Sequence, residues 1–300
     1  MQKLVECIPN FSEGRDKEKL KKLEECCKSV PGCSLFDFQS DESHNRCVVT
    51  LVGSPEAVEE CMFKLVKLAS EIIDMNKHQG AHPRMGATDV IPFVPTLGVT
   101  VEECIEMSKR LAKRIWDELK IPSFLYEDSC TREHCRNLAD IRNDVQYEKM
   151  NEKLQLEEWA PDFGERKMHP TAGIIAIGAR FPLVAYNVNL DTKDVQIAKN
   201  IAKTIRGKNG GYKYCKSLGV ANEQGFAQVT MNLVNYEKTA VYRVQEAIKM
   251  EANRYGVHVT DTELVGLCPA KALLDAAEYY LQLKNFEAYK QCMEYHLIGE

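Results

Sequence analysis

The sequence predicts an α/β (α+β) protein made of two sheet-plus-helix domains. Short apolar segments typical of strands alternate with amphipathic helical segments, and a similar series of strands and helices begins twice along the 300 residues. Hydrophobic residues make up 44% and charged residues 28%, as in globular proteins that bury a substantial core. We place the two domains at residues 1–180 and 181–300. A single doubly wound sheet is the main alternative, disfavoured because no GxGxxG turn joins a strand to a helix.

The first half contains a strand, a helix, a pair of strands and a second helix, followed by further elements. Helical starts are indicated by Ser54-Pro55 and by Thr100. The predicted elements are the strand Leu4–Ile8, the helix Asp16–Lys28, the strands Ser34–Phe38 and Cys47–Val52 joined by the polar loop QSDESHNR, a helix from Ser54 to about Asp74, the strand VIPFVP, the helix Val101–Leu119, the strand Pro122–Tyr126 and helical pieces within Arg136–Glu158.

The second series begins at two apolar strands separated by the turn GARFP. Its first helix has candidate caps at Asp191 and Thr192. The predicted elements are the strands Gly173–Ile177 and Leu183–Leu190, the helix Asp191–Arg206, strands around Ser217–Ala221 and Ala227–Asn232, the helix Ala240–Tyr255, the strand Val257–Thr260 and a helical stretch from Pro269. Both halves therefore predict split β-α-β units.

Charge and cysteine content exclude several classes of protein. A net charge of -5 argues against a general nucleic-acid binder. Twelve cysteines without a CxxC pair indicate reduced thiols, and we interpret Cys7, Cys33, Cys47, Cys61 and Cys268 as buried hydrophobes rather than catalytic groups. No apolar run approaches a signal peptide or a membrane span, so we expect a cytoplasmic protein without a membrane partner.

The segment from Lys77 to Asp89 is the strongest candidate for chemistry. It holds His78 and His82 outside any helical or strand period. Their spacing of four suits helical metal ligands, yet Gly80 and Pro83 make that helix improbable, so we expect no metal. An imidazole in a bent loop is suited to general acid/base catalysis, and His82 has the better claim. The alternative is a loop histidine bonded to a backbone carbonyl.

Neighbouring polar residues are candidates to assist. Arg84 could hold a carboxylate by a two-pronged bond, with an ordinary surface arginine as the alternative. Asp41 and His44 offer second acid/base groups, or belong to a solvated turn. The amide of Asn10 could position a substrate or cap its turn.

Further polar residues lie in the second half. Asn187 and Asn189 share one face of a strand, which favours a polar ligand, although structural hydrogen bonding is the alternative. The stretch IRGKNGGYK forms a basic loop suited to an anionic tail, or a solvated charge run; its cations are Arg206, Lys208 and Lys213.

Six long motifs resemble the glutamate formiminotransferase family across essentially the whole chain: VECIPNFSEGR, DESHNRCVVTLVG, HQGAHPRMGATDVIPFVP, PDFG, AYNVNLDTKDVQIAKNIAKTIR and ELVGLCPAKALLDAA. The resemblance implies two ferredoxin-like subdomains around an electropositive substrate tunnel, and a homodimer. It implies transfer of a formimino group from N-formimino-L-glutamate to N5 of tetrahydrofolate, releasing glutamate in histidine degradation, a step of one-carbon metabolism. It covers the transferase alone, without the cyclodeaminase domain of bifunctional relatives.

By this resemblance His82 is the catalytic histidine and His78 a positioning residue. The resemblance also implies folate contacts at Asp162, Phe163, Gly164, Thr171, Gly173, Gly178 and Arg180, and more loosely at Asn187, Asn189 and Lys208. Some relatives carry Asp-x-Asp where this chain has Asp37-Phe38-Gln39, and Asp41 could replace the missing carboxylate. Two other functions stay open: a 5-formyltetrahydrofolate:glutamate formyltransferase, and a non-catalytic folate-binding protein, which the intact His82 loop disfavours.

Overall fold

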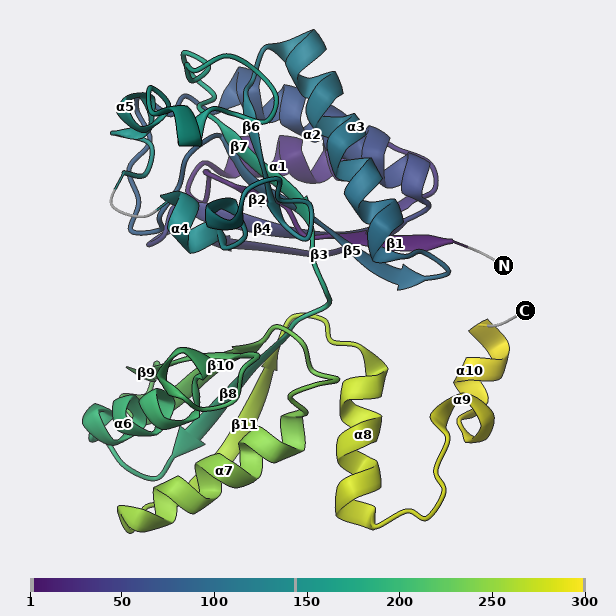
Figure 1. Cartoon of the computed structure of the whole chain (residues 1–300), viewed down its shortest axis with the longest axis vertical. Helices are drawn as coiled ribbons and strands as arrows, with labels where there is room; N and C mark the ends of the chain where they lie inside the picture. Colours follow the sequence, from purple (N-terminus) through teal and green to yellow (C-terminus); the bar gives the residue numbers. More distant parts are fainter. Residues whose placement is uncertain (1–2, 143–144, 299–300) are drawn as a thin grey trace. The chain divides into compact units, whose positions relative to one another are not determined.

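The computed structural model describes residues 3–142 and 145–298, which form two compact units, Met1–Arg180 and Phe181–Glu300 (Figure 1). Each unit has its own sheet and its own hydrophobic core. The mixed α/β class and the two sheets are therefore confirmed.

The sheet of the first unit has β3 at one edge, followed by β4, then β1 and β2 in line, then β5, β7 and the other edge strand, β6. The strands from β3 to β5 pair antiparallel, whereas β5, β7 and β6 run parallel. The strands are β1 (Leu4–Cys7), β2 (Asn10–Phe11), β3 (Cys33–Asp41), β4 (Arg46–Gly53), β5 (Thr88–Leu97), β6 (Ser123–Glu127) and β7 (Ile175–Ala179). Up to β5, this connectivity is that of a split β-α-β unit.

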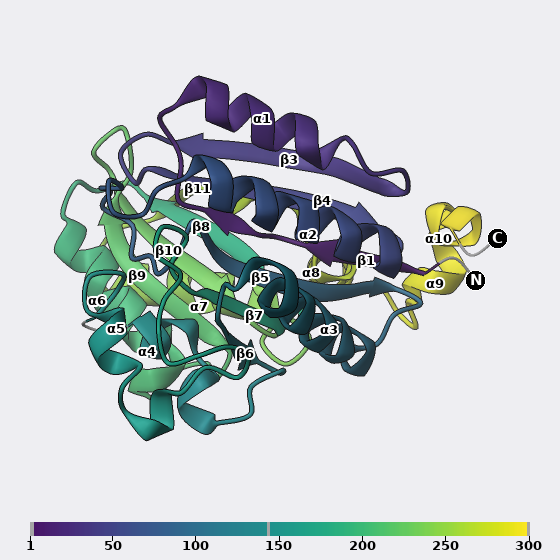
Figure 2. The same ribbon diagram turned by 90° about the horizontal axis from the view of Figure 1, so that it is seen from above.

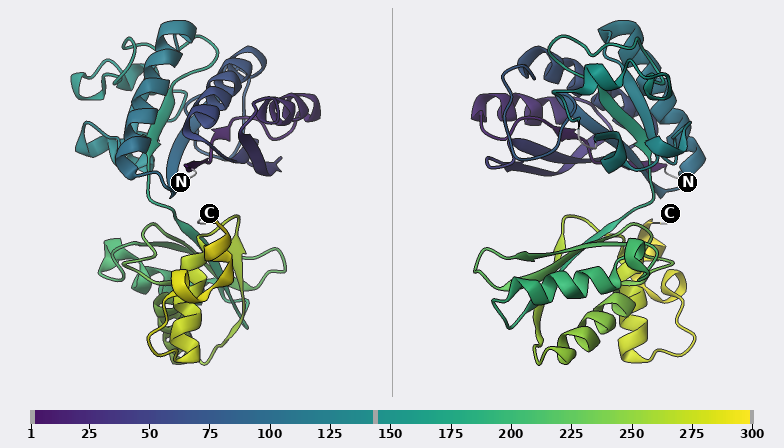
Figure 3. Two further views of the ribbon diagram at one scale, coloured as in Figure 1. Left: turned by 90° about the vertical axis from the view of Figure 1, so that its right-hand side faces the viewer. Right: turned by 60° about the vertical axis from the view of Figure 1, so that its left-hand side comes forward.

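Three helices cover one face of this sheet: α1 (Lys17–Cys27), α2 (Pro55–Ile72) and α3 (Val101–Leu119) (Figures 2 and 3). The side chain of Asp16 caps α1, and Thr100 forms a capping box with Glu103 at the start of α3. Their apolar stripes pack on strand residues such as Val49 and Ile91. The predicted helices are confirmed, and Val101–Leu119 agrees to the residue.

The chain between β6 and β7 contributes the second core of this unit. It contains short helical pieces, as predicted: η1 (Glu133–Cys135), α4 (Leu138–Arg142), α5 (Met150–Lys153) and η2 (Glu157–Trp159). Apolar side chains of these pieces, including Ile141 and Met150, are buried with Val90 and Ala176 of the sheet. The helices α1, α2 and α3 thus cover one face of the sheet, and the segment between β6 and β7 covers part of the other face.

The second unit has the antiparallel strand order β11-β8-β10-β9. Helices α6 and α7 cover one face, through residues such as Ile201 and Ile248 packed on Val188 (Figure 3). Its elements are β8 (Val184–Leu190), α6 (Val195–Ile205), η3 (Gly207–Asn209), β9 (Cys215–Ala221), β10 (Ala227–Leu233), α7 (Val241–Arg254), β11 (Val259–Val265), α8 (Ala270–Leu281), α9 (Ala288–Gln291) and α10 (Met293–Ile298). This too is a β-α-β-β-α-β unit.

Three sequence predictions are wrong in detail. The strand predicted at Gly173–Ile177 is β7, which begins at Ile175 and belongs to the first sheet. Helix α6 is capped by Asp194, because Asp191 instead accepts hydrogen bonds from His258, the residue that precedes β11. The last strand runs to Val265 rather than ending at Thr260. No helix within the described ranges combines the length and apolar content needed to cross a bilayer.

Candidate active site

Three segments that are far apart in the sequence pack directly against one another: the turn at Gly14, the hairpin turn between β3 and β4, and the loop that carries His82. A Cβ atom on Gly14 would lie 2.3 Å from the carbonyl oxygen of Asp41, and one on Gly80 would lie 2.3 Å from that of His44. Only glycine permits such close backbone contacts. The two glycines therefore bring both histidine-bearing segments together.

Asn45 holds the three segments in place. Its backbone is left-handed, with φ 49°, a conformation that Asn tolerates better than most residues. Its Oδ1 accepts from the backbone N–H of Gly14 at 2.9 Å, and its Nδ2 donates to the carbonyl of Gln79 at 2.9 Å. The carbonyl of Asn45 also accepts from Nε2 of His78 at 2.9 Å. Sequence reasoning missed this residue.

We expect Asn45→Ala to lower the free energy of unfolding by about 3 kcal/mol, because it removes one buried and one partly buried hydrogen bond and places Ala in a left-handed conformation. Equilibrium unfolding in urea measures the change. Asn45→Asp is the matched control, since it keeps the acceptor for Gly14, and it should cost less. A loss below about 1 kcal/mol in the Ala variant would show that Asn45 does not hold the turn.

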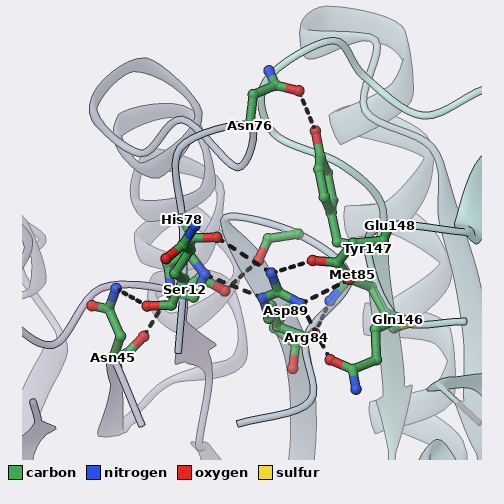
Figure 4. Close-up of polar contacts among 12 residues, drawn as sticks. Ser12, Asn45, Asn76, His78, Arg84, Met85, Asp89, Gln146, Tyr147 and Glu148 are labelled. Atoms are coloured by element: carbon green, nitrogen blue, oxygen red, sulfur yellow. Dashed lines mark hydrogen bonds and ion pairs between the residues drawn. The ribbon is translucent and has the colours of Figure 1, made fainter. Parts of the chain in front are cut away.

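His78 and Arg84 form a hydrogen-bonded pair in the same loop as His82 (Figure 4). Nε2 of His78 donates to the carbonyl of Asn45, so Nδ1 of the same ring accepts from Nε of Arg84 at 3.2 Å. Burial lowers the pKa of His78. Arg84 is buried and holds both carboxylate oxygens of Glu148, at 2.5 and 3.0 Å. The two-pronged bond predicted for a substrate carboxylate is thus made within the protein, and Arg84 orders the loop.

His82 itself is half-buried, and its ring makes no hydrogen bond to the described part of the chain. The imidazole of His44 lies beside it in an edge-on arrangement, with ring centroids 6.4 Å apart. Nδ1 of His44 is 2.6 Å from Oδ2 of Asp41, whose other oxygen accepts from Ser43 and from the backbone of His44. These bonds lower the pKa of Asp41. The geometry joins a carboxylate, an oriented imidazole and an imidazole without a partner.

Burial and nearby arginine charges hold His82 neutral. Burial, then the charges of Arg46 and Arg142, lower the pKa of His82 from 6.5 to about 3. Arg142 in turn is paired with the buried carboxylate of Asp89. A neutral imidazole is ready to accept a proton, and it becomes a strong acid once it has done so.

We expect the His82 ring to remain neutral throughout the range pH 5.5–8, because its pKa lies well below that range. The unfolded chain binds this proton near pH 6.5, so the contribution of His82 to stability falls as the pH decreases below that value. Histidine NMR signals recorded against pH, assigned with a His82→Gln variant, measure the protonation. A His82 signal that titrates near pH 6.5 would contradict the electrostatic argument.

Several other predicted site residues of the first unit have partners within the protein. Asp162 accepts from the backbone of Leu125 at 2.8 Å and pairs with Arg132 at 2.9 Å. Asn10 donates to the carbonyl of Ile8 at 3.3 Å. Phe163 packs partly buried against the core, and the backbone of Arg180 donates to Phe93. These contacts position the strand ends at β6 and β7.

The predicted glycines of this stretch and Thr171 have clear backbone roles. Gly173 has φ 74°, and its Cβ would lie 2.2 Å from the carbonyl of Met85. Gly164 has φ 113° and packs on Pro122, while Gly178 approaches the carbonyl of Tyr126. The carbonyl of Thr171 accepts from Met75 at 2.8 Å, which ties this stretch to the segment before the His82 loop.

In the second unit, the two asparagines of β8 lie on the sheet face opposite α6 and α7. Asn187 donates to Glu263 at 3.1 Å and Asn189 to Asp261 at 2.6 Å. The structural alternative therefore accounts for their amides. Lys208 is exposed in η3. Cys268 is half-buried rather than buried, unlike the four other cysteines named above. Residues 3–142 and 145–298 contain no cluster of three or more His, Cys, Asp or Glu suited to a metal.

Comparison with known proteins identifies the family. Residues 4–180 match the family described as "Formiminotransferase domain, N-terminal subdomain", and residues 185–298 match "Formiminotransferase domain". The chain belongs to the formiminotransferase family. It is 59% identical to a glutamate formimidoyltransferase of Streptococcus pyogenes serotype M1, over 100% of both chains. A glutamate formimidoyltransferase of Thermoplasma acidophilum is 45% identical, over 95% of this chain and 94% of that one. A formimidoyltransferase-cyclodeaminase of Dictyostelium discoideum is 43% identical, over 100% of this chain and 57% of the relative.

This member of the formiminotransferase family is thus an enzyme whose two matched ranges each lie within one structural unit. Sequence reasoning had named His82, Asp41 and His44, and the structure brings these three together. It had missed Asn45, Arg46 and Arg142 around them. Asn in a polar hairpin turn was an available signal for the first. The arginines gave none, because the partner of Arg142 is distant in the sequence and Arg46 has no ion-pair partner in the described residues.

Proposed function

We propose that this protein transfers the formimino group of N-formimino-L-glutamate to N5 of tetrahydrofolate and releases L-glutamate. The similarity to two glutamate formimidoyltransferases, over 100% of one and 94% of the other, carries the proposal. The grouping of His82, His44 and Asp41 supports it, because this transfer requires a proton to move between two nitrogens. Tetrahydrofolate is then a co-substrate, and the site uses no metal.

We assign His82 as the general acid/base. N5 of tetrahydrofolate attacks the formimino carbon, and a tetrahedral intermediate forms. His82, neutral and without an intramolecular bond, takes the proton that N5 loses. The resulting imidazolium gives that proton to the glutamate nitrogen, the bond from this nitrogen to the formimino carbon breaks, and the C=N bond re-forms. Glutamate leaves with its amine intact, and His82 is neutral again.

His44 and Asp41 assist this transfer in our proposal. Because Asp41 accepts from Nδ1 of His44, the other ring nitrogen of His44 is available as an acceptor. An oriented second imidazole at the site can exchange the proton with His82 or with the amidine nitrogen. Asp41 fixes the orientation of the ring, and so takes the place of the carboxylate that the Asp37-Phe38-Gln39 sequence lacks.

We propose the stretch from Asp162 to Arg180 as the folate-contacting region, together with Asn10 and, more loosely, Asn187, Asn189 and Lys208. The close contacts of Gly173 with the Met85 carbonyl and of Gly178 with the Tyr126 carbonyl support it, since they fix the backbone of this stretch. The contacts of Asp162 support a positioning role for that residue. Four features stay predictions: the substrate tunnel, the homodimer, the domain boundary as a functional division and the cytoplasmic location.

The test is glutamate release when the purified protein is mixed with tetrahydrofolate and N-formimino-L-glutamate. We expect glutamate and 5-formiminotetrahydrofolate to form in equal amounts. A parallel reaction with N-formyl-L-glutamate measures the formyl transfer alternative. No glutamate release above the protein-free background would sink the assignment, and binding of tetrahydrofolate without release would favour a non-catalytic folate-binding protein.

A further inference from the structure

We propose that Arg46 binds the α-carboxylate of the glutamyl substrate and thereby holds the formimino carbon beside His82. This inference rests on the proposed formiminotransferase activity and adds the residue that recognises the amino-acid part of the substrate. The loop arginine nominated from the sequence, Arg84, is already occupied by Glu148. Arg46 is the arginine beside His82 that has no such partner.

Arg46 differs from the other enclosed arginines of its unit. Arg84 is paired with Glu148, Arg142 with Asp89, and Arg132 with Asp162. The Nε atoms of Arg46, Arg132 and Arg142 are all buried without an acceptor, but only for Arg46 does no carboxylate in residues 3–142 or 145–298 lie within ion-pair distance of the guanidinium. A half-buried guanidinium normally meets an anion or a ring of acceptors. The missing partner indicates a place for a ligand.

The backbone places this guanidinium rigidly. Arg46 is the first residue of β4 and pairs with Asp41 across the hairpin. A Cβ on Gly14 would lie 2.5 Å from its backbone nitrogen, so the strand start is held by tight packing. Its neighbour Cys47 points into the core, which leaves Arg46 on the opposite face of the sheet.

A ligand can reach the side chain from outside. Arg46 lines an open pocket of about 510 Å³ at the hairpin. The other lining residues are Gln39, Ser40, Asp41, Glu42, Ser43 and Val48. The hydroxyl of Ser43 already donates to Asp41, and the amide of Gln39 donates to Asp37, so the guanidinium of Arg46 is the main donor for a carboxylate in this pocket.

The hairpin places Arg46 close to the reacting group, because Arg46 pairs with Asp41, Asp41 holds His44, and the His44 ring lies 6.4 Å from that of His82. The charge of Arg46 is the largest electrostatic cause that lowers the pKa of His82, ahead of Arg142. Burial and the charge of Arg142 also lower the pKa of Arg46 itself, while Asp41 and Asp89 raise it. Those two carboxylates are engaged elsewhere, Asp41 with His44 and Asp89 with Arg142. The positive charge that remains around His82 is complementary to one additional carboxylate.

The substrate has the matching chemistry. Its α-carboxylate is attached to the same carbon as the formimino nitrogen, whereas the γ-carboxylate lies two carbons further away. An arginine beside His82 therefore suits the α-carboxylate. The amidine is a cation at neutral pH, and Glu42 in the same pocket presents negative charge to it. One pocket can thus accommodate both charges of the reacting end.

The test compares the wild type, Arg46→Gln and Arg46→Lys on two substrates. With N-formimino-L-glutamate we expect Arg46→Gln to lower kcat/KM by about 10- to 100-fold, mainly through KM, as for a lost bond between charged groups. Arg46→Lys keeps the charge but cannot form a two-pronged bond, so its kcat/KM should lie between those of the wild type and Arg46→Gln. The second substrate, 4-(formimidoylamino)butanoate, lacks only the α-carboxylate. The wild type and both variants should use it equally poorly.

Arg110→Gln is the matched control, because it removes the same charge from the exposed surface of α3. Its kinetics should equal those of the wild type, and tetrahydrofolate binding should be unchanged in all variants. If Arg46→Gln does not fold, the comparison of Arg46→Lys with the wild type on the two substrates decides. Equal loss on both substrates, or an unchanged KM for N-formimino-L-glutamate, would overturn the proposal. Absence of wild-type turnover would instead overturn the proposed function itself.

Discussion

His82→Gln is expected to lower kcat for formimino transfer by about 10²–10⁴-fold, the usual range for loss of a general acid/base group. His82 makes no intramolecular hydrogen bond in the described chain, so the substitution should leave the fold and tetrahydrofolate binding nearly unchanged. Steady-state assays of glutamate release give kcat, and fluorescence or calorimetric titration gives the Kd for tetrahydrofolate.

The matched control for this experiment is His296→Gln, which removes an exposed imidazole bonded to a backbone carbonyl in the second unit. Its kcat should equal that of the wild type. His44→Gln should have a smaller effect than His82→Gln, because His44 only assists in our proposal. If His44→Gln abolishes turnover while His82→Gln is active, the roles of the two imidazoles must be exchanged.

Asp89→Ala is expected to reduce the free energy of unfolding by about 3–5 kcal/mol, as for removal of one partner from a buried ion pair. The Asp89 side chain is buried, accepts from the backbone of Met85 at 2.7 Å and pairs with Arg142. Without it, the charge of Arg142 and the Met85 N–H lose their partner beneath the His82 loop. Urea unfolding measures the change.

Asp89→Asn is the matched control for this second prediction. It keeps an oxygen for the Met85 N–H and removes only the charge, so it should destabilise the protein less than Asp89→Ala. Burial raises the pKa of Asp89, and the charge of Arg142 offsets part of that rise. If Asp89→Ala costs less than about 1 kcal/mol, the Asp89–Arg142 pair does not support the loop.

The elements whose signals are local in sequence were predicted well. Helix α3 was predicted to the residue, because Thr100 and Glu103 form a capping box within four residues. The error at α6 has the opposite origin. Asp191 and Thr192 are good caps locally, but Asp191 is bound by His258, 67 residues away, and the helix begins at Asp194 instead.

Strand β7 illustrates what sequence patterns leave open. Its apolar character was recognised, yet its parallel pairing with β5 and β6 assigns it to the first sheet rather than to the second series. Strand partners depend on contacts across many residues, and neither alternation nor turn residues specify them. The same holds for the asparagines of β8, whose acidic partners on β11 are more than 70 residues away.

The sequence predicted the reactive group of the candidate site, but not the residues that hold that group in place. The loop composition around Gly80 and Pro83 singled out His82, and the structure places His44 and Asp41 beside it. The role of Arg84 depended on Glu148, 64 residues away, and could not be read from the loop. Arg46 was predicted as the last residue of the polar loop QSDESHNR. Its lack of a carboxylate partner is visible only once the partners of the other arginines are known.

Formation of 5-formiminotetrahydrofolate by the wild type and by His82→Gln, measured side by side in a single turnover at saturating N-formimino-L-glutamate, tests the central claim most directly. We predict one equivalent of product per wild-type site, and a rate at least about 10²-fold lower in the variant. Equal rates in the two proteins, or no product from the wild type, would contradict it.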